Sequence, residues 1–399
     1  MTQAFKGERL HIAVLGRCNV GKSTVLNCIT GQKAAIVSPQ AGTTGDPVPI
    51  AFELLPLGPV TFYDTAGLDE GSDLGVLRRE AGRKVLARAD LAVLVTDEKG
   101  IGPWEKELAK ALQDIDIPFL VIFNKADVGL PSSASLAWCA ERGLPHFSLS
   151  ADRETDSAPL RKALIALVPA APTPKALITD ILPPGGTVIL VTPIDASAPK
   201  GRLIAPQVQV LRELVEGNFP SLVVQSAMLA QAFAMLREPP ALVLTDSQVV
   251  HEVAKLTPAD VSLTTFSVVF ARYKADFSLL LEGAKAIDSL PENGRVLIAE
   301  ACSHHAQNDD IARVKLPAML KRQTGRELTI DICSGRDFPD NLESYDLVIH
   351  CGGCMLNPGE MNRRLRICLA AGVKATNFGM AISLCQGVLS RVASPFVRR

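Results

Sequence analysis

The stretch GRCNVGKS, residues Gly16 to Ser23, decides the fold of the N-terminal part of the chain. It fits the pattern G-x-x-x-x-G-K-[ST], and it stands between the strand-like run IAVLG and the helix-like run TVLNCIT, as a phosphate-binding loop requires. Glycines let successive backbone N–H groups surround phosphate oxygens at a helix N-terminus. We expect Lys22 to reach the β- and γ-phosphates and the Ser23 hydroxyl to bind Mg²⁺. The stretch therefore predicts a nucleoside triphosphate site in an α/β domain.

A second motif, Asn124-Lys-Ala-Asp127, indicates which base is bound, because it directly follows the strand-like run PFLVIF. An aspartate carboxylate there accepts hydrogen bonds from both guanine N1–H and the exocyclic amine, whereas adenine cannot donate both. GTP is favoured over ATP. The short run SLSA, residues 148–151, is expected to present backbone to the guanine. The residues expected to bind the nucleotide are Gly16, Val20, Gly21, Lys22, Ser23, Thr24, Asn124, Lys125, Asp127, Ser150 and Ala151.

Two segments between these motifs are expected to respond to the γ-phosphate. Asp64 begins the run DTAG and is expected to hold Mg²⁺ through water, and the Gly67 N–H is expected to sense the γ-phosphate. The run GTTGD supplies the hydroxyl groups of Thr43 and Thr44, of which Thr44 is expected to join the metal only when the triphosphate is bound. Leu68 stands where Ras-like proteins carry the glutamine that orients water, so we expect slow turnover. The expected catalytic residues are Lys22, Thr43, Thr44, Asp64 and Gly67.

The 399 residues are too many for one ordinary core, and strand-like runs alternate with helix-like runs along most of the chain. We predict an α/β protein of three domains, with a GTP-binding domain at residues 1–168. A Pro- and Gly-rich linker follows at 169–186. An α/β domain at 187–274 shows no catalytic cluster, and a third α/β domain at 275–399 contains the clustered metal-ligand residue types.

Composition limits the function further. A hydrophobic fraction of 47% with 21% charged residues is typical of a folded protein. Lys and Arg (41) balance Asp and Glu (42), so no basic field favours nucleic-acid binding. No run approaches the roughly 18 apolar residues that span a bilayer, and we expect a cytoplasmic protein without a membrane partner. Nine cysteines spread over such a chain indicate metal binding or burial rather than disulfides.

Five residues of the third domain form the spacing of a metal site. Cys302-Ser-His304 is followed, after 45 intervening residues, by His350-Cys351-Gly-Gly-Cys354. Because the preceding strand-like runs are expected to end at one edge of a sheet, these side chains are expected to converge. The glycine pair permits the close backbone approach that a bulky cluster needs. A thiolate-rich set suits either tetrahedral Zn²⁺ or an iron–sulfur cluster.

The N-terminal motifs resemble the translation-factor-type GTPases of the tRNA-modifying and ribosome-assembly branch, which share G-R-x-N-V-G-K-S and G-T-T-x-D. In several such families the asparagine at the position of Asn19 helps to bind K⁺ beside the phosphates. The resemblance therefore implies that Asn19 joins the nucleotide site and that K⁺ stimulates hydrolysis, supplying charge where an arginine finger otherwise acts.

The order of both motifs along the whole chain resembles the FeFe-hydrogenase maturation GTPases, the HydF family. That family has an N-terminal GTPase domain, a middle dimerisation domain and a C-terminal C-x-H…H-C-x-x-C cluster domain. The resemblance implies that Cys302, Cys351 and Cys354 ligate a 4Fe–4S cluster and leave one iron exchangeable. His304 or His350 would then be the fourth ligand or lie close to that iron.

The same resemblance implies what the protein does and with what. It would carry a two-iron precursor of the hydrogenase active site, receive material from radical S-adenosylmethionine maturases, and deliver the precursor to apo FeFe-hydrogenase. The implied cofactors are GTP or GDP, Mg²⁺, K⁺ and the 4Fe–4S cluster, and the implied assembly is a homodimer through the middle domain.

Two other functions are compatible with the residues. One is a GTPase with a structural zinc site that acts in RNA modification or ribosome assembly. The other is a redox module whose Cys351–Cys354 pair cycles as a dithiol. The remaining cysteines divide into two groups. Burial in the core is expected for Cys28, Cys139, Cys368 and Cys385, whereas Cys333 is either a core residue or a neighbour of the metal site.

Overall fold

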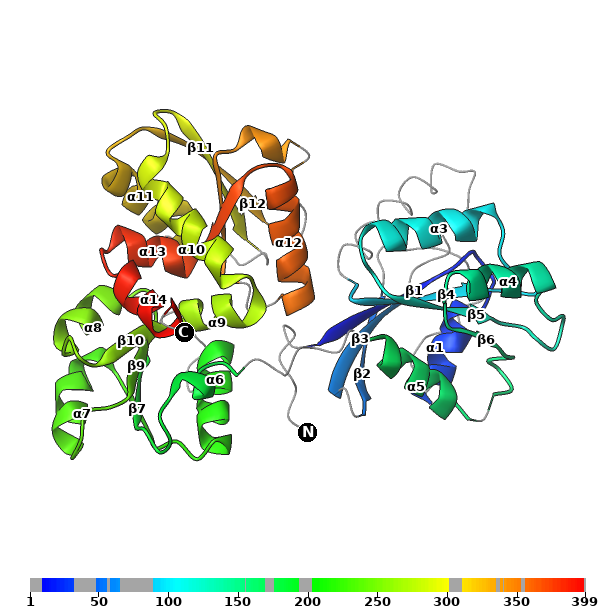
Figure 1. Ribbon diagram of the computed structural model, residues 1–399, viewed down its shortest axis with the longest axis horizontal. Coiled ribbons are helices and arrows are strands. Elements are labelled where there is room, and N and C mark those ends of the chain that lie inside the picture. Colours follow the sequence, from blue (N-terminus) through cyan, green and yellow to red (C-terminus); the bar gives the residue numbers. More distant parts are fainter. Residues whose placement is uncertain are drawn as a thin grey trace. The chain divides into compact units, whose positions relative to one another are not determined.

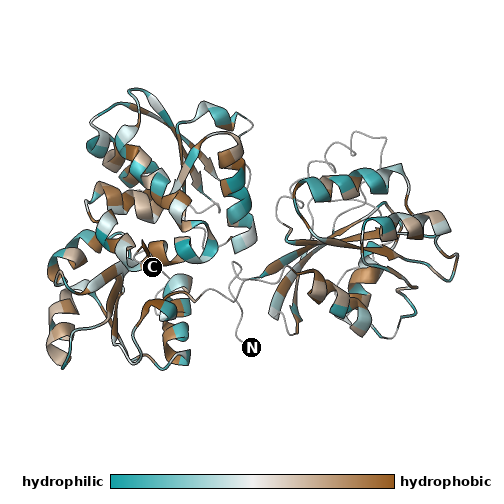
Figure 2. Ribbon diagram, viewed as in Figure 1, coloured by the Kyte–Doolittle hydropathy of each residue, from teal (hydrophilic) through white to brown (hydrophobic). Residues whose placement is uncertain are grey.

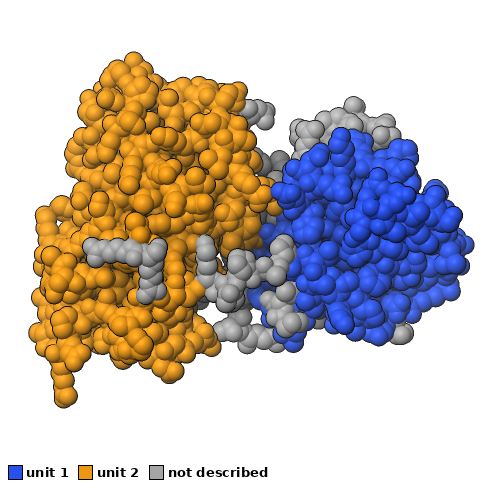
Figure 3. Space-filling model, viewed as in Figure 1, with its two compact units in different colours: residues 1–173 blue, residues 174–399 orange. Residues whose placement is uncertain are grey.

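The computed structural model describes residues 9–31, 48–55, 58–64, 89–154, 156–168, 176–193, 203–300, 311–334, 338–339, 341–352 and 356–397. The chain divides into two compact units, residues 1–173 and 174–399 (Figure 3). In both units the strands are predominantly hydrophobic and the flanking helices carry the hydrophilic residues (Figure 2). Among the described residues, no helix combines the length and the apolar character needed to cross a lipid bilayer.

The first unit is built on a six-stranded sheet with the order β2-β3-β1-β4-β5-β6. Strand β2 is antiparallel to β3, and the other neighbours are parallel. Its strands are β1 (Leu10–Leu15), β2 (Val48–Leu54), β3 (Gly58–Asp64), β4 (Leu91–Thr96), β5 (Phe119–Phe123) and β6 (His146–Ser148). Its described helices are α1 (Lys22–Thr30), α3 (Pro103–Asp114), α4 (Ser133–Glu141) and α5 (Ala158–Leu167).

The central strands of this sheet are apolar throughout because helices cover both faces. All residues of β4 and β5 are buried. Helices α1 and α5 cover one face, and α3 and α4 cover the other (Figure 1). The carboxyl ends of β1, β4, β5 and β6 therefore meet at one edge of the sheet, where open α/β folds bind ligands.

The second unit contains two parallel four-stranded sheets, with the orders β10-β9-β7-β8 and β12-β11-β13-β14. The strands are β7 (Val188–Val191), β8 (Ser221–Val224), β9 (Leu242–Thr245), β10 (Ser262–Thr265), β11 (Gly294–Glu300), β12 (Leu328–Ser334), β13 (Leu347–His350) and β14 (Lys374–Asn377). The α-helices are α6 (Ala205–Glu216), α7 (Leu229–Met235), α8 (Val250–Leu256), α9 (Phe266–Lys274), α10 (Phe277–Lys285), α11 (Leu316–Thr324), α12 (Pro358–Ala370), α13 (Phe378–Cys385) and α14 (Leu389–Val397). Short 3₁₀ turns are η2 (Thr179–Ile181), η3 (Ser226–Met228), η4 (Ala286–Ser289) and η6 (Leu342–Ser344), and Ile311–Lys315 form a π-helical turn. The predicted α/β class with three sheets is confirmed.

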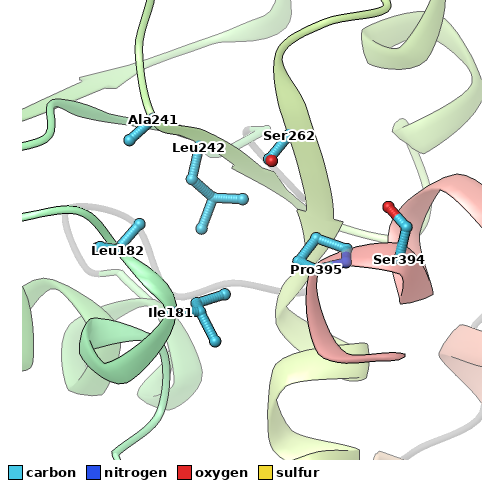
Figure 4. A pocket seen from close by; sticks show the side chains of 7 residues that line it. All are labelled: Ile181, Leu182, Ala241, Leu242, Ser262, Ser394 and Pro395. Atoms are coloured by element: carbon cyan, nitrogen blue, oxygen red, sulfur yellow. The ribbon is translucent and has the colours of Figure 1, made fainter. Parts of the chain in front are cut away.

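One hydrophobic core joins the two sheets of the second unit. The C-terminal helix α14 returns from the third sheet to strand β10, where the Thr264 hydroxyl donates to the Val392 carbonyl over 2.8 Å (Figure 1). A cavity of about 180 Å³ lies beside this contact, lined by Ile181, Leu182, Ala241, Leu242, Ser262, Ser394 and Pro395 (Figure 4). The run SLTTFSVVFARY forms β10 and most of α9, and its apolar residues from Leu263 to Ala271 are buried inside this unit.

The structure differs from the sequence prediction in the second half of the predicted linker. Leu177, Ile178 and Leu182 are buried in the core of the second unit. The Glu213 carboxylate accepts hydrogen bonds from the backbone N–H groups of Leu177, Ile178 and Thr179 at 2.7, 2.9 and 2.9 Å. Proline and glycine content indicates irregular backbone, but it does not reveal whether the residues between them are packed. Residues 169–175 lie outside the described part of the chain.

Candidate functional site

The phosphate-loop sequence connects the carboxyl end of strand β1 to the start of helix α1. Gly21 is the N-cap of α1 and has φ 90°, a left-handed conformation that glycine adopts without strain. A Cβ at Gly21 would lie 2.3 Å from Asn124 Nδ2, and one at Gly16 would lie 2.4 Å from the Val95 carbonyl oxygen. Both glycines are therefore required by close contacts as well as by conformation.

The structure brings together two residues predicted to act on Mg²⁺. The Ser23 hydroxyl, at the start of α1, donates to Asp64 Oδ2 over 2.6 Å at the end of β3. Burial raises the pKa of Asp64, while the hydrogen bond from Ser23 and the positive charge of Lys22 oppose that rise. The Lys22 ammonium donates to the carbonyls of Gly16 and Arg17 at 3.0 and 2.8 Å. A hydroxyl, a carboxylate and an ammonium thus surround the loop, which is the chemistry that a magnesium–phosphate group needs.

Three of the predicted catalytic residues, Thr43, Thr44 and Gly67, lie outside the described residues. Their predicted roles remain predictions. Asn19 and Val20, by contrast, lie in the described loop, where Asn19 has a positive φ of 62°.

The base-recognition loop is held against the phosphate loop. Asn124 is buried, its Nδ2 donates to the Val20 carbonyl over 2.9 Å, and its Oδ1 accepts from the Ala151 N–H over 3.0 Å. The Ser150 hydroxyl accepts from the Asp127 N–H and donates to Asp127 Oδ1, both at 2.9 Å. The predicted runs NKAD and SLSA therefore form one site.

The carboxylate of Asp127 is kept ionised in this site. The hydrogen bond from Ser150 lowers its pKa most, and the positive charge of Arg153, 3.1 Å away, lowers it further. An exposed, ionised carboxylate is an acceptor for two N–H donors at once, which is how guanine is distinguished from adenine.

Sequence reasoning assigned no role to Arg17, whose partners are found only in the structure. Its Nε lies 2.6 Å from Glu105 Oε1, and its Nη2 lies 3.6 Å from Asp97 Oδ1. Glu105 is fully buried at the start of α3, and its Oε2 also accepts from the Gly102 N–H over 2.9 Å. A glutamate three residues after Gly102 is a sequence signal for capping of α3. No sequence signal indicates that the same glutamate also pairs with Arg17 of the phosphate loop.

A second site lies at the carboxyl edge of the third sheet. Strands β11, β12 and β13 are parallel, and the register places Ala299 between Cys333 and His350. The Cys351 N–H continues this ladder by donating to the Ala299 carbonyl over 2.9 Å. Cys333, His350 and Cys351 thus come to one edge, as the expected convergence of the strand ends requires. Cys302, His304 and Cys354 lie outside the described residues.

The imidazole of His350 is completely buried and neutral. Burial lowers its pKa well below the ordinary value, and the positive charge of Arg364 acts in the same direction. Neither ring nitrogen has a hydrogen-bond partner among the described residues, and the ring meets Phe338 edge-on with centroids 5.8 Å apart. A neutral imidazole is the form that ligates metals.

These features fit a thiolate-ligated metal group. Cys351 is half-buried, and the neighbouring imidazole is neutral and unbonded at both nitrogens within the described chain. The described residues alone include no group of three or more His, Cys, Asp or Glu that is close enough to hold a metal ion. The remaining predicted ligands are those outside the described ranges.

The other predicted core cysteines are buried to different degrees. Cys139 and Cys368 are buried, and Cys28 and Cys385 are half-buried. Burial raises the pKa of Cys139, Cys368 and Cys385 to about 11, so their thiols stay protonated.

Comparison with known protein families matches three consecutive parts of the chain. Residues 11–125 match the 50S ribosome-binding GTPase family. Residues 177–275 match the hydrogen maturase F dimerization domain, and residues 278–395 match the hydrogen maturase F tetramerization domain.

Similar individual proteins share the N-terminal part. GTPase Era of Caldicellulosiruptor saccharolyticus is 33% identical over 128 residues, 31% of this chain and 42% of that protein. The tRNA modification GTPase MnmE of Rhodopseudomonas palustris is 34% identical over 171 residues, 41% of this chain and 37% of its own length. The chain thus spans less than half the length of these relatives.

A crystal structure of an Era variant from Aquifex aeolicus bound to GDP.AlF4⁻ is 29% identical, covers 40% of this chain and 56% of that chain, and has a TM-score of 0.35.

With a P-loop GTPase domain related to those of Era and MnmE, followed by both maturase domains in order, the chain belongs to the hydrogen maturase F family.

Proposed function

We propose that this protein is a slow, K⁺-stimulated GTPase that binds a 4Fe–4S cluster and delivers a two-iron precursor to apo FeFe-hydrogenase. The observation that carries the proposal is the buried His350 imidazole, unbonded at both nitrogens within the described chain, next to Cys351 at the carboxyl edge of the third sheet and within the maturase-matched part of the chain. A nucleotide switch and a thiol-bearing edge in one chain are the two parts that a regulated carrier needs.

The nucleotide half of the proposal assigns one task to each group. Lys22 neutralises the phosphates, Ser23 and Thr44 bind Mg²⁺ directly, and Asp64 holds it through water. Support comes from the short hydrogen bond between Ser23 and Asp64, 41 residues apart in sequence. Gly67 would sense the γ-phosphate, and Asn19 would help to bind K⁺ beside it.

The metal half assigns the cluster to Cys302, Cys351 and Cys354. When bound through three thiolates, a 4Fe–4S cluster supplies one iron with an exchangeable position. His350, held neutral by burial, is suited to approach that iron, and His304 is the other candidate for the fourth ligand. The donor types are those that bind iron–sulfur clusters or zinc.

The proposed partners follow from the family. The two domains matched as dimerization and tetramerization domains support a homo-oligomer. We propose that two copies of the chain form a homodimer through residues 187–274. The dimer would receive material from radical S-adenosylmethionine maturases and deliver the two-iron precursor to apo FeFe-hydrogenase. It would bind no nucleic acid.

The test is the metal content of the full chain after anaerobic reconstitution, measured as iron, sulfide and zinc, with electron paramagnetic resonance after reduction. We expect about four irons and four sulfides per chain, lost when Cys302, Cys351 and Cys354 are all changed to alanine. The matched control changes Cys28 and Cys385 to alanine and should keep the metal.

Loaded protein should then activate apo FeFe-hydrogenase, and the triple variant should not. Stoichiometric zinc without iron would overturn the carrier proposal and support a structural zinc site. A measurable two-electron potential in metal-free protein would support the dithiol alternative instead. Lys22→Ala separates the two halves, because it should abolish GTP binding or turnover while leaving the metal content intact.

A further inference from the structure

Arg364 is a buried arginine on α12, only 3% exposed. Within the described part of the chain, none of its three guanidinium nitrogens has a hydrogen-bond partner. A buried guanidinium normally donates to carboxylates or carbonyls, because a buried charge without hydrogen bonds destabilises the fold. No described side chain accepts a hydrogen bond from Arg364, so its N–H groups are available to an anionic group at this place in the fold.

Phe338 connects Arg364 to the carboxyl edge of the third sheet. The guanidinium carbon lies 4.5 Å from the centre of the Phe338 ring, and the same ring contacts His350. These ring contacts place Arg364 near the carboxyl edge of the sheet, where β13 ends at His350 and Cys351 follows.

The titratable acidic groups around Arg364 come from three elements. Glu360 lies one turn earlier on α12, and Cys368 lies one turn later. Cys333 at the end of β12 and Cys351 after β13 also interact electrostatically with the guanidinium. Glu360 is the one residue of this set that is normally ionised, and no hydrogen bond joins it to the guanidinium. If the only role of Arg364 were to neutralise Glu360, its guanidinium would donate a hydrogen bond to the Glu360 carboxylate.

A thiol changes this balance when it becomes a metal ligand. Cys351, the proposed ligand that the structure describes, would then carry a thiolate, and a guanidinium can donate N–H groups to thiolate sulfur. Hydrogen bonds to the sulfurs and net charge both set the reduction potential of an iron–sulfur cluster.

We propose that Arg364 is a positioning residue of this metal site: its guanidinium donates to the thiolate of Cys351 and offsets its negative charge, which raises the reduction potential of the bound cluster. This inference rests on the proposed function, because it requires the cluster. It adds a residue outside the C-x-H…H-C-x-x-C pattern to the site.

The experiment compares Arg364→Met, Arg364→Lys and Arg366→Met with the unchanged full chain after anaerobic reconstitution. Methionine keeps much of the length and removes the charge, lysine keeps the charge, and Arg366 is an exposed residue of the same helix. The midpoint potential is read from the paramagnetic signal during titration with dithionite. We expect Arg364→Met to lower the equilibrium constant for one-electron reduction of the cluster at least tenfold, which corresponds to a decrease of about 59 mV in midpoint potential. Arg364→Lys should shift it less, and Arg366→Met should leave it unchanged.

Loss of iron from Arg364→Met with retention in Arg364→Lys would also support the proposal.

The two possible failures are distinguishable. If the unchanged chain takes up no cluster, the proposed function fails and this inference fails with it. If the unchanged chain holds the cluster, and Arg364→Met matches it in iron content and midpoint potential, only the role of Arg364 is overturned.

Discussion

The side-chain amide of Asn124 donates to the backbone carbonyl of Val20 over 2.9 Å, which ties the base-recognition loop directly to the phosphate loop across 104 residues of sequence. The same side chain accepts from the Ala151 N–H, so one buried amide holds three segments of the nucleotide site together. Because a buried amide that loses a partner leaves a polar group unsatisfied, this link is sensitive to truncation.

Asn124→Ala should weaken GTP binding at least tenfold. Truncation leaves the Val20 carbonyl and the Ala151 N–H without their partner, at a cost of about 1–3 kcal/mol for each group. Binding of a fluorescent GTP analogue measures the effect. The control is Gln113→Ala, an exposed position on α3 of the same unit, which should bind like the unchanged chain. Equal affinity in both variants would show that the link does not support nucleotide binding.

Asp127→Asn should exchange guanine for xanthine specificity. The carboxylate that accepts from two guanine donors becomes an amide, which clashes with one donor but can donate to the additional carbonyl of xanthine. GTP affinity should fall about 100-fold, since two charge-assisted hydrogen bonds are lost, and XTP should bind more tightly than GTP. Competition between the two nucleotides tests this, with Asp152→Asn, an exposed position in the loop that follows β6, as the unaffected control. Retained preference for GTP would remove Asp127 from the base site.

Glu105→Ala should destabilise the nucleotide unit by about 2 kcal/mol. Breaking a buried ion pair costs more than this, but the Arg17 side chain is 30% exposed and water compensates part of the loss. Both tryptophans of the chain, Trp104 and Trp138, lie in this unit, so their fluorescence during urea unfolding reports on it alone.

Glu107→Ala, an exposed change on the same helix, is the control for that experiment. A double-mutant cycle with Arg17→Ala should give a favourable coupling energy on the order of 1 kcal/mol. Purely additive effects of the two changes would mean that Arg17 and Glu105 do not stabilise each other.

The buried thiols should react with iodoacetamide only at high pH. Burial raises the pKa of Cys139 and Cys368 to about 11, so at pH 8 their thiolate fraction is about a hundredfold below that of a thiol with the ordinary value of 9.0. Because the thiolate is the reactive form, alkylation of both should accelerate about a hundredfold between pH 8 and pH 10. Mass spectrometry of the peptides in folded and urea-unfolded protein measures the rates. Equal rates in the two states at pH 8 would contradict the buried assignment.

Local motifs could be interpreted correctly because their chemistry is local. The run from Gly16 to Ser23 requires glycine conformations and a helix start that neighbouring residues dictate, and the structure provides both. The α/β class followed from alternating apolar runs for a similar reason, since strands covered on both faces must be apolar throughout.

Packing partners were not predictable in the same way. Alternating strand-like and helix-like runs predicted an α/β domain at 275–399, but they could not indicate that α14 would pack on β10 of the preceding sheet. Nor could the proline-rich stretch before Gly186 show that Leu177 and Ile178 enter a core. A pattern states that a residue is buried, not against which element.

The sequence by itself determined the nucleotide, the fold class and the family resemblance, because each depends on residue types at fixed short spacings. Only the tertiary structure decided that Asn124 donates a hydrogen bond to Val20 and that Glu105 forms an ion pair with Arg17. It alone also decided that Arg364 and His350 contact the same Phe338 ring. These pairs are far apart along the chain or come from different elements. They meet because strand order and helix packing place them together, and that arrangement is a property of the whole core rather than of any motif.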